Sequence, residues 1–333
     1  MFTLADTSEK SFSSLTELKN HLANRKKRSY MVPKSKLSLS EGGVLRSDRF
    51  EGQLAESGFK GLLNVYGIPQ KFADDVCPPD LLSTIVERLS KGNDEPVRIQ
   101  IIDNVVTAIM SSDRLPISHE VLVDWLENIG PIKEAVIGRS YLRITSFTEE
   151  CKELLPGDAF GFGWELLNGE DGWRSTEAQR YVVRLICTNG LVGFDKTATF
   201  CRSPQTNEAI AESLEKLGNI LTNMAEVEGL EKGVEWAAQQ RIGNEREAVI
   251  KYLAQRLNGN ATRLALEEST TSDTSWYDLL NNITSSARLH QLDMRRRYEL
   301  EGGTLLNWFS SQGRRRAPWR RRFCETCDHW PAD

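Results

Sequence analysis

The sequence predicts an α+β fold, with a strand-rich middle at about residues 97–203 followed by a helical second half. Two patterns support this prediction. Several segments of the middle alternate hydrophobic and polar residues, which is the period of a strand with one buried face. Beyond Pro204, hydrophobic residues recur every three or four positions, as in amphipathic helices. The chain has 333 residues, 39% of them hydrophobic, and is therefore long enough to bury a sizeable core.

Composition divides the chain into three predicted parts. Residues 1–57 are rich in Ser, Lys and Glu and predict a mobile, partly disordered arm, with one short helix where Leu15, Leu18 and Leu22 fall at helical spacing. Residues 58–306 predict a single α+β domain. Residues 307–333 form an Arg-rich tail that we expect to be disordered.

The first elements of the domain are predicted by local signals. Pro78 and Pro79 open a helix, since proline suits the first turn. The apolar runs 97–101 and 105–110 flank Asp103-Asn104 and predict a β-hairpin. Ser118 is a predicted N-cap of the helix that follows.

Strands are then expected at 135–144 and 160–166, the second ending in the glycine-containing turn 168–172. Segment 175–190 is compatible with a strand or a helix. Ser175 as an N-cap and Gly190 as a C-cap favour a helix that leads into a short strand at Leu191.

Three helices follow in the second half. The first passes through Ile210 and Met224. The second is indicated by Asn244 with Glu247 three residues later, and the third by Ser275 with Asp278, which form a pair resembling a capping box.

Several classes of protein are disfavoured. No stretch approaches the roughly 18 apolar residues of a membrane span, and the first thirty residues are polar, so no membrane partner is expected. The six cysteines are mostly scattered, which is typical of a reducing compartment, and we expect a cytoplasmic protein. Neither a P-loop nor a dinucleotide, His-Glu-x-x-His or Gly-x-Ser-x-Gly motif occurs, which favours a protein that is not an enzyme.

Arginine provides the candidate nucleic-acid contacts. The net charge is −5, yet the tail interleaves an aromatic residue with arginines: Arg314, Arg315, Arg316, Trp319, Arg320, Arg321 and Arg322. Such a segment is typical of a flexible clamp whose affinity comes from counterion release, with a merely solvated tail as the alternative. The run Arg25 to Arg28 is a weaker candidate of the same kind.

A second candidate contact lies next to the glycine turn. Arg180 and Arg184 are four residues apart on the predicted helix, and Trp173-Arg174 precede it. Arginine matches phosphate oxygens with paired donors, and an indole can stack on a base. An ion-paired or solvated helix face is the alternative.

Metal sites are secondary candidates. Cys324 and Cys327 have the spacing of half a zinc knuckle with His329 nearby, but a closed site needs four ligands, and a tail without metal is the preferred interpretation. Four carboxylates of the middle region would suit Mg²⁺ if they converge, although acids beside a turn are usually solvated. They are Asp158, Glu165, Glu170 and Asp171. No cofactor is therefore predicted, with Zn or Mg as the minor alternatives.

The segment 184–191 reads Arg-Leu-Ile-Cys-Thr-Asn-Gly-Leu. Together with the turn 167–172 and the segment 276–284, it resembles the phage and plasmid-like family described as domain of unknown function number 932, over roughly residues 59–306. The resemblance implies a phage, prophage or plasmid setting, often among genes of DNA metabolism, and no established activity. The family usually has Asn-Ser in the acidic turn where this chain has Asn168-Gly169.

The motif core consists of Cys187, Thr188, Asn189 and Gly190. Cys187 as a nucleophile competes with Cys187 as a packed thiol before a structural cap. The packed thiol is favoured, since the C-terminal end of a helix disfavours a thiolate.

We therefore expect a non-enzymatic, nucleic-acid-associated protein that binds or anneals single-stranded DNA during replication or recombination of a phage or plasmid. A homo-oligomer is one assembly in which such a protein would act. A factor that binds a host or phage protein is one alternative. A divalent-metal-dependent enzyme built on the acidic turn is the other.

Overall fold

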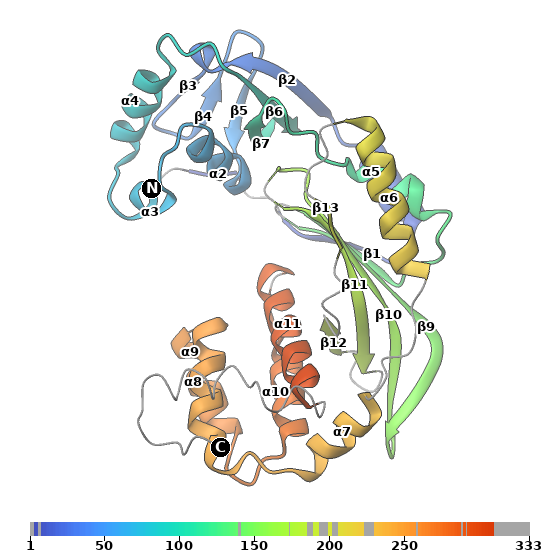
Figure 1. Ribbon diagram of the computed structural model, residues 1–333. Coiled ribbons are helices and arrows are strands. Elements are labelled where there is room, and N and C mark those ends of the chain that lie inside the picture. Colours follow the sequence, from blue (N-terminus) through green and yellow to red (C-terminus); the bar gives the residue numbers. More distant parts are fainter. Residues whose placement is uncertain are drawn as a thin grey trace. The chain divides into compact units, whose positions relative to one another are not determined.

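The computed structural model describes residues 3–5, 8–138, 141–172, 174–184, 189–192, 199–201, 206–222, 230–257, 259–287, 289–290 and 292–309. Strands predominate in the first half and helices in the second, which confirms the predicted α+β class (Figure 1). Where the sequence indicated one domain over 58–306, the chain divides into two compact units. The first comprises Met1–Thr145, Leu166–Ala178 and Thr199–Thr222, and the second Ser146–Glu165, Gln179–Ala198 and Asn223–Asp333.

A six-stranded sheet forms much of the first unit. Its order is β2-β6-β7-β5-β4-β3, and its strands are antiparallel except for the parallel pair β5 and β7. The strands are β2 (Lys27–Pro33), β3 (Ser38–Leu39), β4 (Val44–Arg46), β5 (Glu51–Leu54), β6 (Pro96–Ile102) and β7 (Val105–Ser111). The predicted β6–β7 hairpin is confirmed, and Asp103 and Asn104 have φ values of 51° and 66°, as a tight primed turn requires.

Helices α2 (Glu56–Val65), α3 (Gln70–Asp75) and α4 (Pro79–Ser90) accompany this sheet. Helix α2 packs against β7 at Gly58 and Gly61, where any Cβ would overlap with backbone atoms of the strand. Helix α4 begins at proline, as predicted. The sheet and helices share a buried core that includes Val32, Leu45, Leu54, Leu62, Leu82, Val97, Ile99 and Val106.

The prediction of a mobile arm over residues 1–57 is wrong for the residues that the structure describes. They form β1 (Lys10–Phe12), α1 (Leu15–Ala23), the 3₁₀ turn η1 (Lys34–Lys36) and strands β2 to β5. Strand β2 pairs with β6 from Lys27 to Pro33, and Leu18 is fully buried. The predicted short helix is confirmed as α1. Composition misled here because these elements bury only one face, so most of their residues remain polar.

The second sheet has the order β1-β8-β9-β10-β11-β12, with β13 also paired to β11. Its further strands are β8 (Glu134–Ile137), β9 (Leu142–Leu155), β10 (Asp158–Asn168), β11 (Thr176–Arg184), β12 (Asn189–Val192) and β13 (Thr199–Cys201). The strand expected at 160–166 is confirmed within β10. The segment 135–144 contains parts of two antiparallel strands instead of one strand.

The predicted helix over 175–190 is wrong, because residues 176–184 form strand β11. This strand pairs antiparallel with β12 from Tyr181 to Arg184 and with β13 from Thr176 to Ala178. Ser175 therefore caps no helix, and Gly190 lies within β12. Tyr, Thr and the paired valines suit a pleated strand better than a helix, and the two partner strands decide the outcome.

The remaining helices of the first unit are α5 (His119–Leu126) and α6 (Asn207–Thr222). The Ser118 cap of α5 is confirmed, since its hydroxyl accepts a hydrogen bond from the Val121 N–H at 3.2 Å. A Cβ added at Gly218 of α6 would contact the ring of Trp125, which shows how closely α6 approaches α5.

The second unit is built mainly from helices: α7 (Leu230–Gln239), α8 (Arg246–Arg256), α9 (Gly259–Ser269), α10 (Trp276–Ala287) and α11 (Leu292–Phe309), with the 3₁₀ turn η2 (Gly243–Glu245). Asn244 lies inside η2, and the N-cap of α8 is Glu245, so α8 begins one residue later than predicted. The Ser275–Asp278 pair is confirmed: the Asp278 N–H donates to Ser275 Oγ at 3.0 Å, and the Ser275 hydroxyl donates to Asp278 Oδ2 at 2.6 Å. Within the described part of the chain, no helix combines the length and apolar character needed to cross a bilayer.

Candidate functional site

The first unit contains a cavity of about 270 Å³. Elements from distant parts of the sequence line it: β1, α1, the β6–β7 hairpin, α5 and the glycine turn that follows β10. Its charged lining residues are the bases Lys10 and Arg25 and the acids Asp103, Glu170 and Asp171. A cavity with a few converging polar groups is the default candidate for a binding site.

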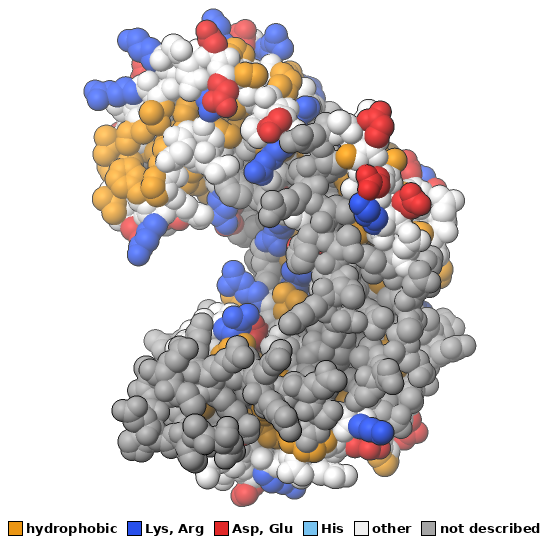
Figure 2. All heavy atoms as spheres, in the orientation of Figure 1, with side chains coloured by type: hydrophobic (Ala, Val, Ile, Leu, Met, Phe, Trp, Pro, Cys, Tyr) orange, Lys and Arg blue, Asp and Glu red, His pale blue; other side chains and the backbone are white. Residues whose placement is uncertain are grey.

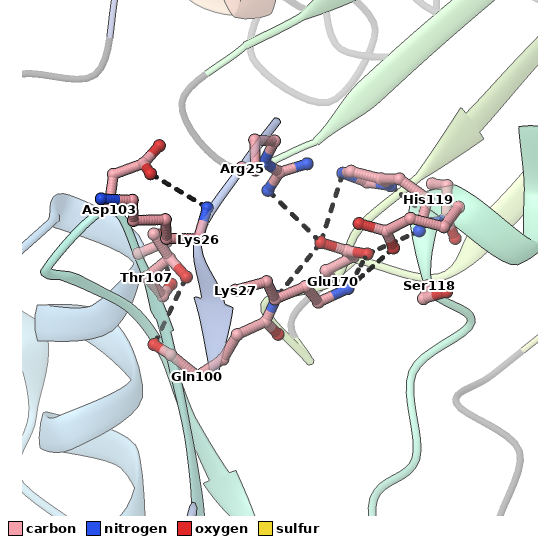
Figure 3. A network of polar contacts seen from close by, with 12 residues as sticks. Arg25, Lys26, Lys27, Gln100, Asp103, Thr107, Ser118, His119 and Glu170 are labelled. Atoms are coloured by element: carbon pink, nitrogen blue, oxygen red, sulfur yellow. Dashed lines mark hydrogen bonds and ion pairs between the residues drawn. The ribbon is translucent and has the colours of Figure 1, made fainter. Parts of the chain in front are cut away.

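Glu170 is the centre of a polar network at this cavity (Figure 3). Its Oε1 atom lies 2.7 Å from Lys27 Nζ and accepts the backbone N–H of His119 at 2.5 Å. Its Oε2 atom accepts Gln100 Nε2 at 3.1 Å and lies 3.6 Å from Arg25 Nη2. The side chain is almost fully buried, so this carboxylate depends on protein donors for its stability.

The glycine turn that carries Glu170 is fixed by its local sequence. Gly172 has φ of 75°, a conformation that glycine adopts without strain. At Gly169, an added Cβ would lie 2.6 Å from the Cβ of Arg174, so the two ends of the turn lie too close together for a side chain at this position. The backbone N–H of Arg174 donates to Asp171 Oδ1 at 3.3 Å and closes the loop. These contacts explain why glycine occupies position 169 of this turn.

The ring of His119 is held by a hydrogen bond at Nδ1, and its Nε2 atom faces Glu170. Thr176 donates its hydroxyl to Asn168 Oδ1 at 2.5 Å, so the Asn168 amide nitrogen faces His119 Nδ1 at 2.9 Å and the Ile117 carbonyl at 2.8 Å. His119 Nδ1 is then an acceptor, which assigns the imidazole proton to Nε2, 3.9 Å from Glu170 Oε2.

The two buried groups influence each other's protonation. Burial lowers the pKa of His119 to about 4, against the charge of Glu170, which raises it. Burial by itself would raise the pKa of Glu170, but the charges of His119 and Lys27 and the hydrogen bonds from both residues hold it well below its usual range. At neutral pH the site therefore contains a neutral imidazole and an ionised carboxylate.

Arg25 belongs to this network, and its hydrogen bonding among the described residues is incomplete. Its side chain is only 10% exposed, and Nη2 faces Glu170, whereas the buried Nη1 atom has no hydrogen-bond partner among the described residues. A buried donor without a partner costs about 1–3 kcal/mol. Arg25 also lines the cavity, so its guanidinium lies beside the space open to an anionic group.

The predicted arginine contact at the glycine turn is only partly described. Arg174 lies over the ring of Tyr141, with its guanidinium carbon 3.9 Å from the ring centroid. The backbones of Arg180 and Arg184 lie in β11, but their side chains are outside the described part, as is Trp173. The tail residues Arg314–Arg316, Trp319, Arg320–Arg322, Cys324, Cys327 and His329 also lie outside it, as do Cys187 and Thr188.

The carboxylates considered for Mg²⁺ contact protein donors. Asp158 accepts the hydroxyl of Tyr277, and Glu165 contacts Gln179 and Arg296. Glu170 belongs to the network described above. Among the described residues, no group of three or more His, Cys, Asp or Glu side chains is placed to hold a metal ion.

Sequence reasoning missed most of this site. Arg25 and Lys27 were noted only as part of a basic run, and Glu170 as a carboxylate beside a turn. Gln100 carried a usable signal, since a polar residue in the apolar run Ile99 to Ile102 indicates a buried amide with a partner. His119 carried none, because it reads as an ordinary residue of the first helical turn.

Comparison of the chain with protein-family models, with curated proteins and with solved structures finds no match. The resemblance to domain of unknown function number 932 therefore stays a prediction.

Proposed function

We propose that the protein is a non-enzymatic, nucleic-acid-associated protein whose first unit binds a phosphate group in the cavity beside Arg25. The observation that carries the proposal is the buried Arg25 guanidinium, which faces one carboxylate with Nη2 and leaves Nη1 without a partner among the described residues. Guanidinium groups match phosphate oxygens with paired, charge-assisted hydrogen bonds. Lys10, which also lines the cavity and is exposed, adds a second positive charge.

The chemistry of the cavity supports binding over catalysis. A general base must present a free lone pair to the substrate. His119 uses Nδ1 to accept from Asn168 and turns Nε2 toward Glu170, and both oxygens of Glu170 already accept hydrogen bonds. These two groups hold the site together and are poorly placed to move a proton on a ligand.

Two sequence features extend the proposal to nucleic acid, with single-stranded DNA favoured. The resemblance to a phage and plasmid-like family supplies a setting in replication or recombination. The arginines of the tail, from Arg314 to Arg322, supply the composition of a flexible backbone contact. Arg25 itself belongs to the basic run Arg25 to Arg28 that the sequence singled out.

Fluorescence anisotropy with a labelled single-stranded oligonucleotide tests this function. We expect binding that weakens by more than about tenfold between about 50 mM and about 200 mM salt. Arg25→Met should weaken it by about tenfold or more, whereas Arg28→Met, which removes an exposed arginine of the same run, should change it by about twofold. Absence of binding at low salt, or an Arg25→Met protein that binds like the wild type, would overturn the proposal.

A second candidate, a protein-interaction factor, is favoured by one observation. Val76, Leu81 and Leu89, at the end of α3 and on α4, are 69%, 44% and 43% exposed. Hydrophobic side chains gather over this part of the first unit (Figure 2). This function predicts no affinity for nucleic acid and a protein partner whose binding is lost in a Val76→Ser, Leu81→Ser variant that unfolds at the wild-type temperature. Equal recovery of every partner by wild type and variant would refute it.

A further inference from the structure

We infer that the group bound beside Arg25 is a terminal phosphomonoester, presented by a nucleoside monophosphate or by the phosphorylated end of a strand. The inference rests on the proposed function and names the ligand chemistry of the same site. Three properties of the cavity support it: its positive charges, its acids and its size.

Two of the lining residues, Arg25 and Lys10, are cations that can share one dianionic group. Arg25, which is mostly buried, and Lys10, which is exposed, both line the cavity, while Glu170 already has Lys27 as a partner at 2.7 Å. A phosphomonoester carries a charge of about −1.5 to −2 near neutral pH and offers three acceptor oxygens. A phosphodiester carries a single charge and therefore gains less from two cations.

The acids of the cavity disfavour a second phosphate. Asp103 and Asp171 line the same space as Arg25. Oδ1 of Asp103 accepts the Lys26 N–H at 3.1 Å, which leaves its other oxygen for ligand donors. Like charges repel a polyphosphate or a continuing phosphate backbone, whereas the hydroxyl and amino groups of a nucleoside can donate to these carboxylates.

The size of the cavity also favours the end of a ligand. Its volume of about 270 Å³ lies just below the range of about 300–1,000 Å³ of pockets that enclose drug-sized molecules. It can take one small ligand or one terminal residue.

Matched oligonucleotides test the inference. The probes are one single-stranded sequence with a 5′-phosphate, a 3′-phosphate or hydroxyls at both ends, labelled internally, and the competitors are AMP, ADP and adenosine. We expect at least one phosphorylated strand to bind about tenfold more tightly than the unphosphorylated one, or AMP to compete about tenfold better than adenosine. Arg25→Met should abolish either difference, and Arg28→Met should keep it. A strand preference identifies a strand end, and AMP competition alone identifies a mononucleotide.

The failures of the two proposals can be distinguished. If all three strands bind alike, Arg25→Met weakens them equally and AMP competes no better than adenosine, the inference is overturned and the proposed function survives. If no strand binds but AMP binds through Arg25, the ligand chemistry holds and the nucleic-acid association falls.

A second variant keeps the test decisive if Arg25→Met does not fold. Asp103→Asn removes one of the two repelling acids, and asparagine tolerates the left-handed backbone at this position. The ratio of ADP affinity to AMP affinity should be at least threefold higher in the variant than in the wild type. Removing a like-charge repulsion at a partly exposed site has an effect of roughly this size. An unchanged ADP-to-AMP ratio would contradict the role given to this acid.

Discussion

The charge of Glu170 should be worth a large part of the stability of the first unit. Glu170→Gln keeps the size of the side chain but removes the negative charge, so that Lys27 and Arg25 face an uncharged amide. Removing one partner of a buried ion pair costs about 3–5 kcal/mol. Because Lys27 is 26% exposed and can regain water, we expect the lower end, about 3 kcal/mol.

Native-state hydrogen exchange of the β2 amides measures this loss where it arises. A loss of about 3 kcal/mol predicts exchange about a hundredfold faster in Glu170→Gln, provided that these amides exchange through opening of the whole unit. Glu120→Gln is the matched control, since Glu120 contacts the same Lys27 nitrogen at 2.9 Å but is more exposed. An exposed ion pair contributes less than about 1 kcal/mol, so this substitution should accelerate exchange less than fivefold. An acceleration below about fivefold in Glu170→Gln would refute the reasoning.

The pH dependence of the unfolding free energy provides an independent check that folding lowers the pKa of Glu170. The pKa of Glu170 is lowered in the folded state, so its stabilisation is present above the unfolded pKa near 4.5 and is lost as the pH falls through the folded value. The difference in unfolding free energy between wild type and Glu170→Gln should therefore narrow as urea titrations move from pH 6 toward pH 3. A constant difference would contradict the lowered pKa.

Two further predictions concern the same site. Burial lowers the pKa of His119 from 6.5 to about 4, so the unfolded chain binds more protons than the folded protein between these pH values. The wild type should therefore lose about 2 kcal/mol of unfolding free energy at this residue between pH 7 and pH 5, and His119→Asn should not show this loss in urea titrations. Parallel curves of stability against pH for the two proteins would contradict the prediction. Gly169→Ala should destabilise the protein by about 1–3 kcal/mol, because its Cβ would lie 2.6 Å from a neighbouring atom, whereas Gly42→Ala, with its nearest atom at 3.8 Å, should differ little from wild type in thermal unfolding.

Local signals predicted much of the fold. The Asp103-Asn104 turn, the Ser118 cap and the Ser275–Asp278 pair each depend on residues within four positions of one another, so the sequence alone determines them. Strand β11 depends instead on pairing with β12 and β13, which no local pattern reveals. The hydrophobic pattern of segment 176–184 is compatible with the period of a strand and with that of a helix, and pairing with β12 and β13 makes it a strand.

The site was hidden by sequence distance. Lys27 and Glu170 lie 143 residues apart, so each reads locally as a solvated charge. The fold places both beside the cavity and buries the carboxylate. A single sequence does not predict this pairing, because the desolvation cost that requires a buried charge to have a partner arises only in the folded protein.

The basic run Arg25 to Arg28 shows how the fold gives neighbouring charges different roles. Arg28 is exposed, whereas Arg25 and Lys27 both approach Glu170, so two cations share one carboxylate. Lys27 reaches a second acid, Glu120, at 2.9 Å, but the buried Nη1 of Arg25 has no acceptor among the described residues. Gln100 and the His119 N–H occupy further acceptor positions of Glu170, which leaves this carboxylate little capacity for Arg25. The protein thus satisfies the acceptors of Glu170 more fully than the donors of Arg25.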